Sequence, residues 1–216
     1  MKIIAIDTAT DVCGITYLID GEIIHTIEDN IPRQHAKSLP LFYEKLCSET
    51  ELTLSNIDGI AVSIGPGSFT GLRIGLSYSK GLAFGCGLPI IPVPTLTAIM
   101  KSGGIINGTA QAILYSHRDI VYAQRFKIIN NILNPDNEIA AYQWEKITPL
   151  IKKLDFIVQI GCNDLIIEKK NIQSGYTSSS IIAQLANEHF EEWVIDKPYS
   201  LVPNYISPFN IGVKKP

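Results

Sequence analysis

The sequence predicts an α/β fold made of two similar halves, and two observations lead to that prediction. Short apolar runs typical of buried strands alternate with segments whose apolar residues recur at helical spacing. The same order of strands, helix, strand and helix also occurs twice along the 216 residues. With 46% hydrophobic and 18% charged residues, a chain of this length can bury a substantial core. We expect one half over residues 1–103 and the other over residues 104–216, with Ser102-Gly103-Gly104 at the boundary.

The first half should open with three strands, because three apolar runs follow one another with only short polar breaks. Asp20-Gly21, between the second and third runs, is a strong hairpin signal. The strands are expected at Lys2–Asp7, Val12–Ile19 and Glu22–Glu28.

A helix should follow between about His35 and Ser48. Its apolar residues are spaced i, i+3, i+4 and i+7, which forms one helix face. These residues are Leu39, Phe42, Tyr43 and Leu46. Pro40 is tolerated only in a first turn, so the helix should start near Ala36 or Ser38.

The most distinctive segment runs from Gly65 to Gly75 and reads Gly-Pro-Gly-Ser-Phe-Thr-Gly-Leu-Arg-Ile-Gly. It follows a predicted strand over residues 57–64 and opens into a helix expected to end near Phe84. A strand, a glycine-rich turn and a helix start together form a corner that accepts anions. However, the segment lacks the Lys-Ser or Lys-Thr of a P-loop, and its glycines miss the dinucleotide-binding spacing. The corner therefore suits close backbone approach, with no evident side chain for chemistry.

The remaining elements complete the first half and repeat its order in the second. A strand over Leu88–Val93 and a brief helix over Thr95–Lys101 end the first half. The tail from Pro198 carries further prolines and is expected to be irregular. In the second half, strands are expected at Ala110–Ser116, Ile120–Ile129, Ile132–Ala140 and Phe156–Ile160, and helices at Gln143–Leu154 and Ser178–Trp193.

Composition excludes several classes of protein. The formal net charge of −3 does not favour a stand-alone nucleic-acid binder. The four cysteines are scattered without a Cys-x-x-Cys pair, which argues against a zinc site or a disulfide framework. The amino end reaches Asp7 after only a few apolar residues, which is not a signal-peptide pattern. The most apolar stretch, residues 82–96, is interrupted by prolines and cannot form a continuous membrane helix. We therefore expect a cytoplasmic protein that does not bind membranes.

The glycine-rich segment, together with Met1-Lys2-Ile3-Ile4-Ala5-Ile6-Asp7-Thr8-Ala9-Thr10, closely resembles the bacterial TsaB (YeaZ) family. The resemblance is strong over roughly the first hundred residues. It implies the actin, Hsp70 and sugar-kinase fold, a ribonuclease H-like fold with two similar subdomains, each a mixed sheet with flanking helices. It also implies a non-catalytic scaffold or activator subunit that binds TsaD and the ATPase TsaE.

That complex makes threonylcarbamoyladenosine at the adenosine next to the tRNA anticodon. The resemblance implies no catalytic residue and no cofactor in this chain, with ATP or ADP bound only at the level of the complex. It implies indirect contact with tRNA and allows a homodimer. In the catalytic relative TsaD, a His-x-x-x-His metal pair falls where this chain has Thr95 and Ile99, so no metal is expected.

The resemblance further places the partner interface on the two long helices of the first half. In the family, these helices form a bundle with the matching helices of TsaD or of a second copy. The expected interface residues are Leu39, Phe42, Tyr43, Leu46, Leu72, Arg73, Leu76 and Ser79. Each interior glycine costs a helix about 1 kcal/mol, so the pairs Gly71/Gly75 and Gly81/Gly85 suggest close backbone approach. Either this chain's own sheet or a partner helix would account for it, and both could do so on opposite faces.

A second candidate site lies where the superfamily carries an Asp-x-Gly-Thr phosphate loop. Here Ala9 takes the glycine position, and its methyl group would crowd a phosphate. A turn capped by Asp7 is the favoured interpretation, and a vestigial nucleotide or anion site is the other. The residues of that vestigial site would be Asp7, Thr8, Thr10, Gly65, Gly67 and Ser68.

Two enzymatic alternatives use the same corner. One is a weak nucleotide-binding ATPase or phosphotransferase that depends on Asp7. The other is a peptidase with Ser68 as nucleophile, although Ser68 lacks the flanking glycines of a nucleophile elbow and an identifiable histidine partner. The second half departs from the family pattern at residues 116–122 and 203–207, which favours a domain without an active site.

Overall fold

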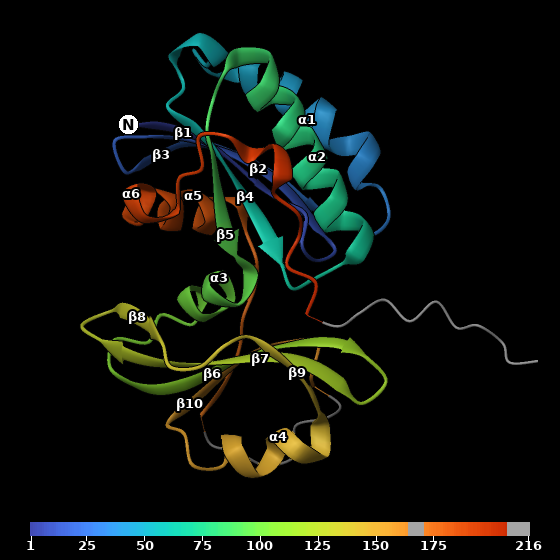
Figure 1. The fold of residues 1–216 in the computed structure, drawn as a ribbon, viewed down its shortest axis with the longest axis vertical. Coiled ribbons are helices and arrows are strands. Elements are labelled where there is room, and N and C mark those ends of the chain that lie inside the picture. The colour runs from blue at the N-terminus through green and yellow to red at the C-terminus, as the bar shows by residue number, and fades with distance from the viewer. Residues whose placement is uncertain (164–170, 207–216) are drawn as a thin grey trace, which may run out of the picture.

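The computed structural model describes residues 1–163 and 171–206, and it confirms the α/β class with two mixed sheets (Figure 1). The first sheet has the strand order β3-β2-β1-β4-β5. Strands β1 to β3 are antiparallel neighbours, whereas β4 and β5 run parallel to β1. The strands are β1 (Lys2–Asp7), β2 (Val12–Ile19), β3 (Glu22–Asn30), β4 (Gly59–Gly65) and β5 (Ile90–Pro94).

The second sheet repeats this plan with the order β11-β10-β6-β7-β8. Its antiparallel part is β6 to β8, and β10 and β11 are parallel to β6. The strands are β6 (Gly108–His117), β7 (Ile120–Ile129), β8 (Ile132–Pro135), β10 (Phe156–Ile160) and β11 (Ile172–Ser174). The two halves therefore share one topology, as the repeated order of elements predicts.

Helices cover both faces of the first sheet. α1 (His35–Glu49) and α2 (Phe69–Cys86) pack on the face that carries Ile4 and Ile6 of β1. α5 (Ser179–Glu188) packs on the opposite face, with Ile3 and Ala5. This alternation along β1 is the period of two expected for a strand that is buried on both faces.

The second sheet is also covered on both faces. α3 (Thr95–Ser102) lies between the two sheets and packs its Leu96 and Ile99 against β6, β7 and β10. α4 (Trp144–Ile151) covers the outer face through Ile147 and Ile151. Because α5 returns to the first sheet, residues from the second half of the chain contribute to the first core (Figure 1). The domain boundary at residue 103 remains a prediction. A cut there would separate the strands of the two sheets, but α5, which follows residue 103 in the chain, packs on the first sheet.

Two predicted elements are wrong in detail. The expected strand Ile132–Ala140 is two strands, β8 and β9 (Ala140–Gln143), which pair with opposite ends of β7. Between them, the Asn137 side chain accepts a hydrogen bond from the Arg125 amide at 2.7 Å, so a side chain replaces the strand ladder there. The expected helix Ser178–Trp193 is likewise divided into α5 and α6 (Phe190–Trp193) at His189, whose φ of −116° is not helical.

Helix α1 also begins earlier than predicted, at His35, and Pro40 lies inside it beyond the first turn. The carbonyl of Ala36 loses its helical partner as a result. Ala36 is exposed, so water can hydrate that carbonyl.

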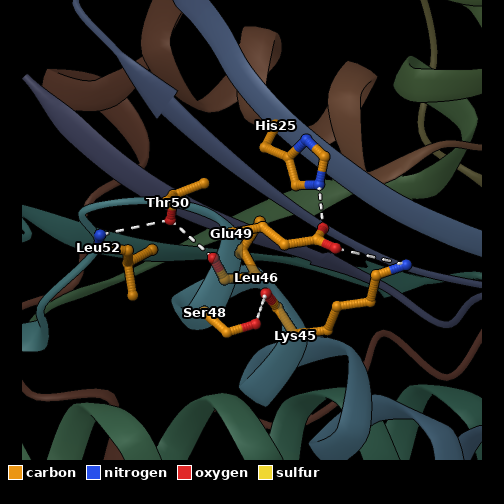
Figure 2. Close-up of polar contacts among 7 residues, drawn as sticks. All are labelled: His25, Lys45, Leu46, Ser48, Glu49, Thr50 and Leu52. Atoms are coloured by element: carbon orange, nitrogen blue, oxygen red, sulfur yellow. Dashed lines mark hydrogen bonds and ion pairs between the residues drawn. The ribbon is translucent and has the colours of Figure 1, made fainter.

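The carboxyl end of α1 is fastened to β3 by a polar cluster (Figure 2). The Glu49 carboxylate binds His25 Nε2 at 2.8 Å and lies 3.8 Å from the Lys45 ammonium. Thr50 Oγ1 donates to the Leu46 carbonyl at 2.7 Å and accepts from the Leu52 amide at 3.3 Å. These bonds satisfy groups that a helix end otherwise leaves unpaired, and they hold α1 in place on the sheet.

Candidate functional site

The loop after β1 and the turn before α2 meet at one corner of the first sheet. Asp7 ends β1 and is fully buried. Its Oδ1 accepts hydrogen bonds from Ser63 Oγ at 2.7 Å and from the Ala9 amide at 3.1 Å. Its Oδ2 has no hydrogen-bond partner among the described residues. Burial raises the pKa of Asp7 above its usual value, although the hydrogen bonds from Ser63 and the Ala9 amide act in the opposite direction.

The structure brings the six residues of the vestigial site together, but several of their polar groups are already bonded to other residues of the chain. The Ser68 amide donates to the Ala9 carbonyl at 2.7 Å, and the Gly65 amide donates to Thr95 Oγ1 at 3.1 Å. Ser68 Oγ caps α2 by accepting from the Gly71 amide at 3.2 Å. A phosphate at this corner would have to displace bonds that the chain already makes.

Further contacts close the corner against a ligand. Thr8 Oγ1 donates to the Gly71 carbonyl at 2.8 Å, and the hydroxyls of Thr10 and Thr177 lie 2.8 Å apart. A Cβ on Gly67 would lie 2.3 Å from the Ala9 carbonyl oxygen, so the turn and the loop are in direct contact. The glycine at this position serves packing within the chain.

The peptidase alternative requires a histidine bound to Ser68. In residues 1–163 and 171–206, no hydrogen bond joins Ser68 to a histidine. His117 lines the same cleft as Ser68, but its Nδ1 pairs with Ser116 Oγ at 2.9 Å. The corner therefore does not contain an assembled Ser-His pair.

The predicted partner interface needs correction at most of its positions. Five of its residues are buried in this chain's own core, because they lie on the faces of α1 and α2 that pack on the sheet. Phe42 and Tyr43 are partly buried against the same core, and Arg73 is exposed. The five buried residues are Leu39, Leu46, Leu72, Leu76 and Ser79.

The positions of the metal pair of TsaD have structural roles here. Thr95 is fully buried and accepts the hydrogen bond from Gly65, and Ile99 is fully buried in the core under the second sheet. Over the described ranges, no group of three or more His, Cys, Asp or Glu side chains is arranged to hold a metal ion.

A cleft of about 1220 Å³ lies between the two sheets, next to the closed corner. Its lining includes Phe69 and Arg73 of α2, Tyr115 of β6, Tyr122 of β7 and Tyr205 of the carboxyl-terminal segment. No local sequence pattern indicates the tyrosines, because they come from segments far apart in the chain and carry no motif. Of these five residues, only Arg73 was predicted as a site residue, and for a different role; Thr10, Gly67 and Ser68 of the vestigial site also line the cleft.

The carboxyl-terminal segment runs along α2 and reaches the cleft (Figure 1). Lys80 Nζ donates to the Tyr199 carbonyl at 2.9 Å, and the Phe84 and Tyr199 rings meet edge to face at 6.2 Å. The Asn204 amide extends the contact by donating to the Ile64 carbonyl at 2.7 Å. Its described part begins with a short 3-10 helix at Pro198–Ser200 and is otherwise irregular, as predicted, but its main chain is tied to the first sheet; the predicted tail beyond residue 206 lies outside the described residues.

Comparisons with known proteins identify the family. The family described as "TsaD: tRNA N6-adenosine threonylcarbamoyltransferase" matches residues 23–199. The chain is 26% identical over 193 residues to the TsaB protein of Bacillus subtilis. This alignment covers 88% of this chain and 82% of that protein. It is 37% identical over 102 residues to TsaB of Haemophilus influenzae. The chain belongs to the TsaB (YeaZ) family.

The share of each chain that is aligned differs from one TsaB relative to another. The H. influenzae alignment covers 47% of this chain and 43% of the relative, and the Escherichia coli TsaB alignment covers 52% and 48%. The chain thus matches less than half of the length of these two relatives. All three are named as tRNA threonylcarbamoyladenosine biosynthesis proteins.

A solved structure confirms the fold implied by the resemblance to TsaB. YeaZ from Pseudomonas aeruginosa superimposes with a TM-score of 0.80 at 21% identity, over 94% of this chain and 99% of that chain. Together with the two mixed sheets and their flanking helices, this match confirms the actin, Hsp70 and sugar-kinase fold. Among the described residues, no helix is long and apolar enough to cross a membrane.

Proposed function

We propose that this TsaB-family chain is a non-catalytic scaffold and activator subunit for making threonylcarbamoyladenosine next to the tRNA anticodon. The main support is the closed corner, in which the Ser68 amide is bonded to the Ala9 carbonyl and Asp7 is buried. A TsaD-like protein would perform the chemistry, and a TsaE-like ATPase would join the complex in the cytoplasm. ATP or ADP would bind at the level of the complex, and tRNA would contact this subunit only indirectly.

The partner surface would lie on the outward faces of α1 and α2. There, Leu41 is 53% exposed and Phe84 is 76% exposed. Tyr199, beside Phe84, is 67% exposed. The Phe84 and Tyr199 rings are in contact, and a patch of exposed apolar side chains is typical of surfaces that bind other proteins. A second copy of this chain would compete for the same surface in the absence of the TsaD-like partner.

A charge at the most exposed of these residues tests the surface. Phe84→Glu should weaken binding to the TsaD-like protein of the same cell by about thirtyfold or more, measured by calorimetry, because the charge would be desolvated in the interface. Ile132→Glu is the matched control, since Ile132 is 62% exposed on β8 of the other half. Both variants should melt like the wild type. Equal binding by wild type and Phe84→Glu would place the interface elsewhere.

The isolated chain should not hydrolyse ATP above background, because the Gly65 and Ser68 amides of the corner are already paired. The measurement is phosphate release with the purified protein, alone and with the TsaD-like partner. Turnover by the isolated wild type that disappears in Asp7→Asn would support the ATPase alternative and contradict the scaffold proposal.

A further inference from the structure

After the helices that cover the first sheet, residues 198–206 form the carboxyl-terminal segment, which runs along one side of α2 (Figure 1). It comes from the second half of the chain and returns to elements of the first half. Beyond the short 3-10 helix Pro198–Ser200, residues 201–206 lie in no helix or strand. No ladder of hydrogen bonds therefore fixes their position, and individual contacts determine where the segment lies.

Two side chains of α2 hold the segment by hydrogen bonds at the surface. Lys80 Nζ donates to the Tyr199 carbonyl at 2.9 Å, and Arg73 Nε donates to the Tyr205 hydroxyl at 2.8 Å. Seven positions separate Lys80 from Arg73, so both bonds leave the same side of the helix. Both bonds are exposed, so water competes for the donors and each bond contributes only modestly to holding the segment.

A small apolar surface anchors the segment from below. Leu201 is half-buried against the core of the first half, and Pro198 and Pro203 are buried. The Asn204 amide adds a main-chain bond to the Ile64 carbonyl at 2.7 Å. Segments with few buried side chains and exposed hydrogen bonds open at a lower free energy than core strands do. The segment therefore has a docked state, on α2, and a released state that does not require the sheet to unfold.

Tyr199 and Val202 lie on the other side of the segment, which faces the solvent. The Tyr199 ring meets the Phe84 ring edge to face, with 6.2 Å between the ring centres. Val202 is 65% exposed, and Tyr199 and Phe84 are more exposed still. The docked state thus adds apolar side chains of the segment to the surface that carries Phe84, whereas release would separate Tyr199 from Phe84.

We propose that docking of the carboxyl-terminal segment controls the partner surface, so that the TsaD-like protein binds the docked state and not the released one. This inference rests on the proposed function, because the surface concerned is the one that contains Phe84. Lys80 and Leu201 are positioning residues that set how much of the protein is docked. The observed affinity for the partner is reduced by the fraction of molecules in which the segment is released. By linkage, the bound partner in turn holds the segment on α2.

Hydrogen exchange of the Asn204 amide, measured by NMR on the isolated chain, reports docking directly. Its opening constant should exceed that of the β4 amides by at least about a hundredfold, because the segment opens without the sheet. Leu201→Ala should speed its exchange about tenfold and Lys80→Met about threefold, with the β4 amides unchanged. Lys80→Arg keeps a charged donor and should restore the wild-type rate. Lys127→Met is the matched control, since Lys127 is an exposed lysine on β7 of the other half.

The same amide then reports what the partner does. In the complex saturated with the TsaD-like protein of the same cell, Asn204 should exchange at least about tenfold more slowly than in the isolated chain. Calorimetry on the double variant Lys80→Met/Leu201→Ala should show weaker binding of the partner. The loss should equal the fall in docked fraction that exchange of Asn204 gives for the isolated variant.

Two results would overturn the proposal. One is an Asn204 amide that exchanges only together with the β4 amides, because the segment would then have no released state of its own. The other is unchanged or faster exchange of Asn204 in the saturated complex, and faster exchange would show that the partner displaces the segment. Phe84→Glu separates these failures from a failure of the proposed function. If Phe84→Glu binds the partner like the wild type, the partner surface itself is wrong. If it loses binding while Asn204 gains no protection in the wild-type complex, only the role of the segment is wrong.

Discussion

The inner and outer faces of α2 carry two pairs of glycines at the same spacing in very different surroundings. A Cβ on Gly71 would lie 2.1 Å from the Thr8 carbonyl oxygen, and a Cβ on Gly75 would lie 2.2 Å from Thr8 Oγ1. Among residues 1–163 and 171–206, nothing lies within 4 Å of a Cβ placed on Gly81 or Gly85. The first pair therefore lets α2 contact the end of β1, whereas the second pair leaves its backbone open.

This difference shows what a helical glycine pair does and does not indicate. Close backbone approach within the chain explains Gly71 and Gly75 completely, and no partner is needed to account for them. Gly81 and Gly85 still cost helix stability, and no contact within the described structure offsets that cost. They lie at the end of α2 that carries the exposed Phe84. The inner face is thus a packing surface, and the outer face is the one available to a partner.

The largest expected effect comes from a charge on the inner face. Leu76 is only 4% exposed and packs in the core under α1 and α2. Leu76→Arg should destabilise the protein by about 3–5 kcal/mol, because it buries an unpaired charge. Chemical denaturation measures this loss. Ser77→Arg, at the next and exposed position, should change stability by less than about 0.5 kcal/mol. A Leu76→Arg variant that melts like the wild type would show that this face is not the inner one.

A methyl group on the inner glycine pair should have the next largest effect. Gly71→Ala places a Cβ against a backbone oxygen of the loop after β1, which cannot move without shifting the strand end. We expect a loss of about 1–3 kcal/mol in the free energy of unfolding, measured by urea denaturation. If Gly71→Ala were as stable as the wild type, the contact between α2 and Thr8 would be looser than the structure shows.

How far the sequence predicts this molecule depends on whether the signal is local. The strands of the first sheet and the glycine-rich corner follow from turn residues and apolar runs that lie close together in the chain. By contrast, the helical spacing of Leu39 and Leu46 identified a face without indicating whether it meets the sheet or a partner. Residues on one stripe of a helix share a direction, and only the tertiary structure determines what lies there.

The second half shows the same limit. Asn137 interrupts the strand ladder through one side-chain hydrogen bond, which no periodicity indicates. The cleft combines Arg73, Tyr115 and Tyr205 from three distant segments, so their meeting depends on how the two sheets are placed. The family resemblance predicted the fold correctly. However, it also led to the prediction that leucines of α1 and α2 form the partner interface, and these leucines are buried in the core.

The buried acid next to Thr8 provides a pH-dependent test of the inner face. Burial raises the folded-state pKa of Asp7 above its usual value of 3.8. The stability contributed by its neutral form is therefore complete below pH 3.8 and is lost as the pH rises through the folded-state pKa. The loss is about 1.4 kcal/mol for each pH unit in that window.

Asp7→Asn mimics the neutral acid and can still accept the bonds from Ser63 and Ala9. It should be more stable than the wild type at neutral pH and nearly equal to it near pH 4. The measurement is the difference in unfolding free energy between the two proteins across that pH range. A difference that does not vary with pH would mean that Asp7 is charged in the folded protein, and that an unseen group stabilises that charge.

The smallest effect should come from the outer glycine pair, and its sign is opposite. Gly81→Ala adds a methyl group that meets nothing within 4 Å, so the gain in helix propensity is not offset by a clash. The isolated protein should become more stable by about 0.5–1 kcal/mol, measured by denaturation alongside Gly71→Ala.

Binding to the TsaD-like protein then distinguishes two forms of the interface. If a partner helix approaches the backbone of α2 at Gly81, the same methyl group should weaken binding severalfold although the chain itself is more stable. If the partner contacts only side chains such as Phe84, binding should be unchanged. A loss of stability in the isolated chain would contradict the comparison itself, because it would mean that the outer face is packed against part of the same molecule.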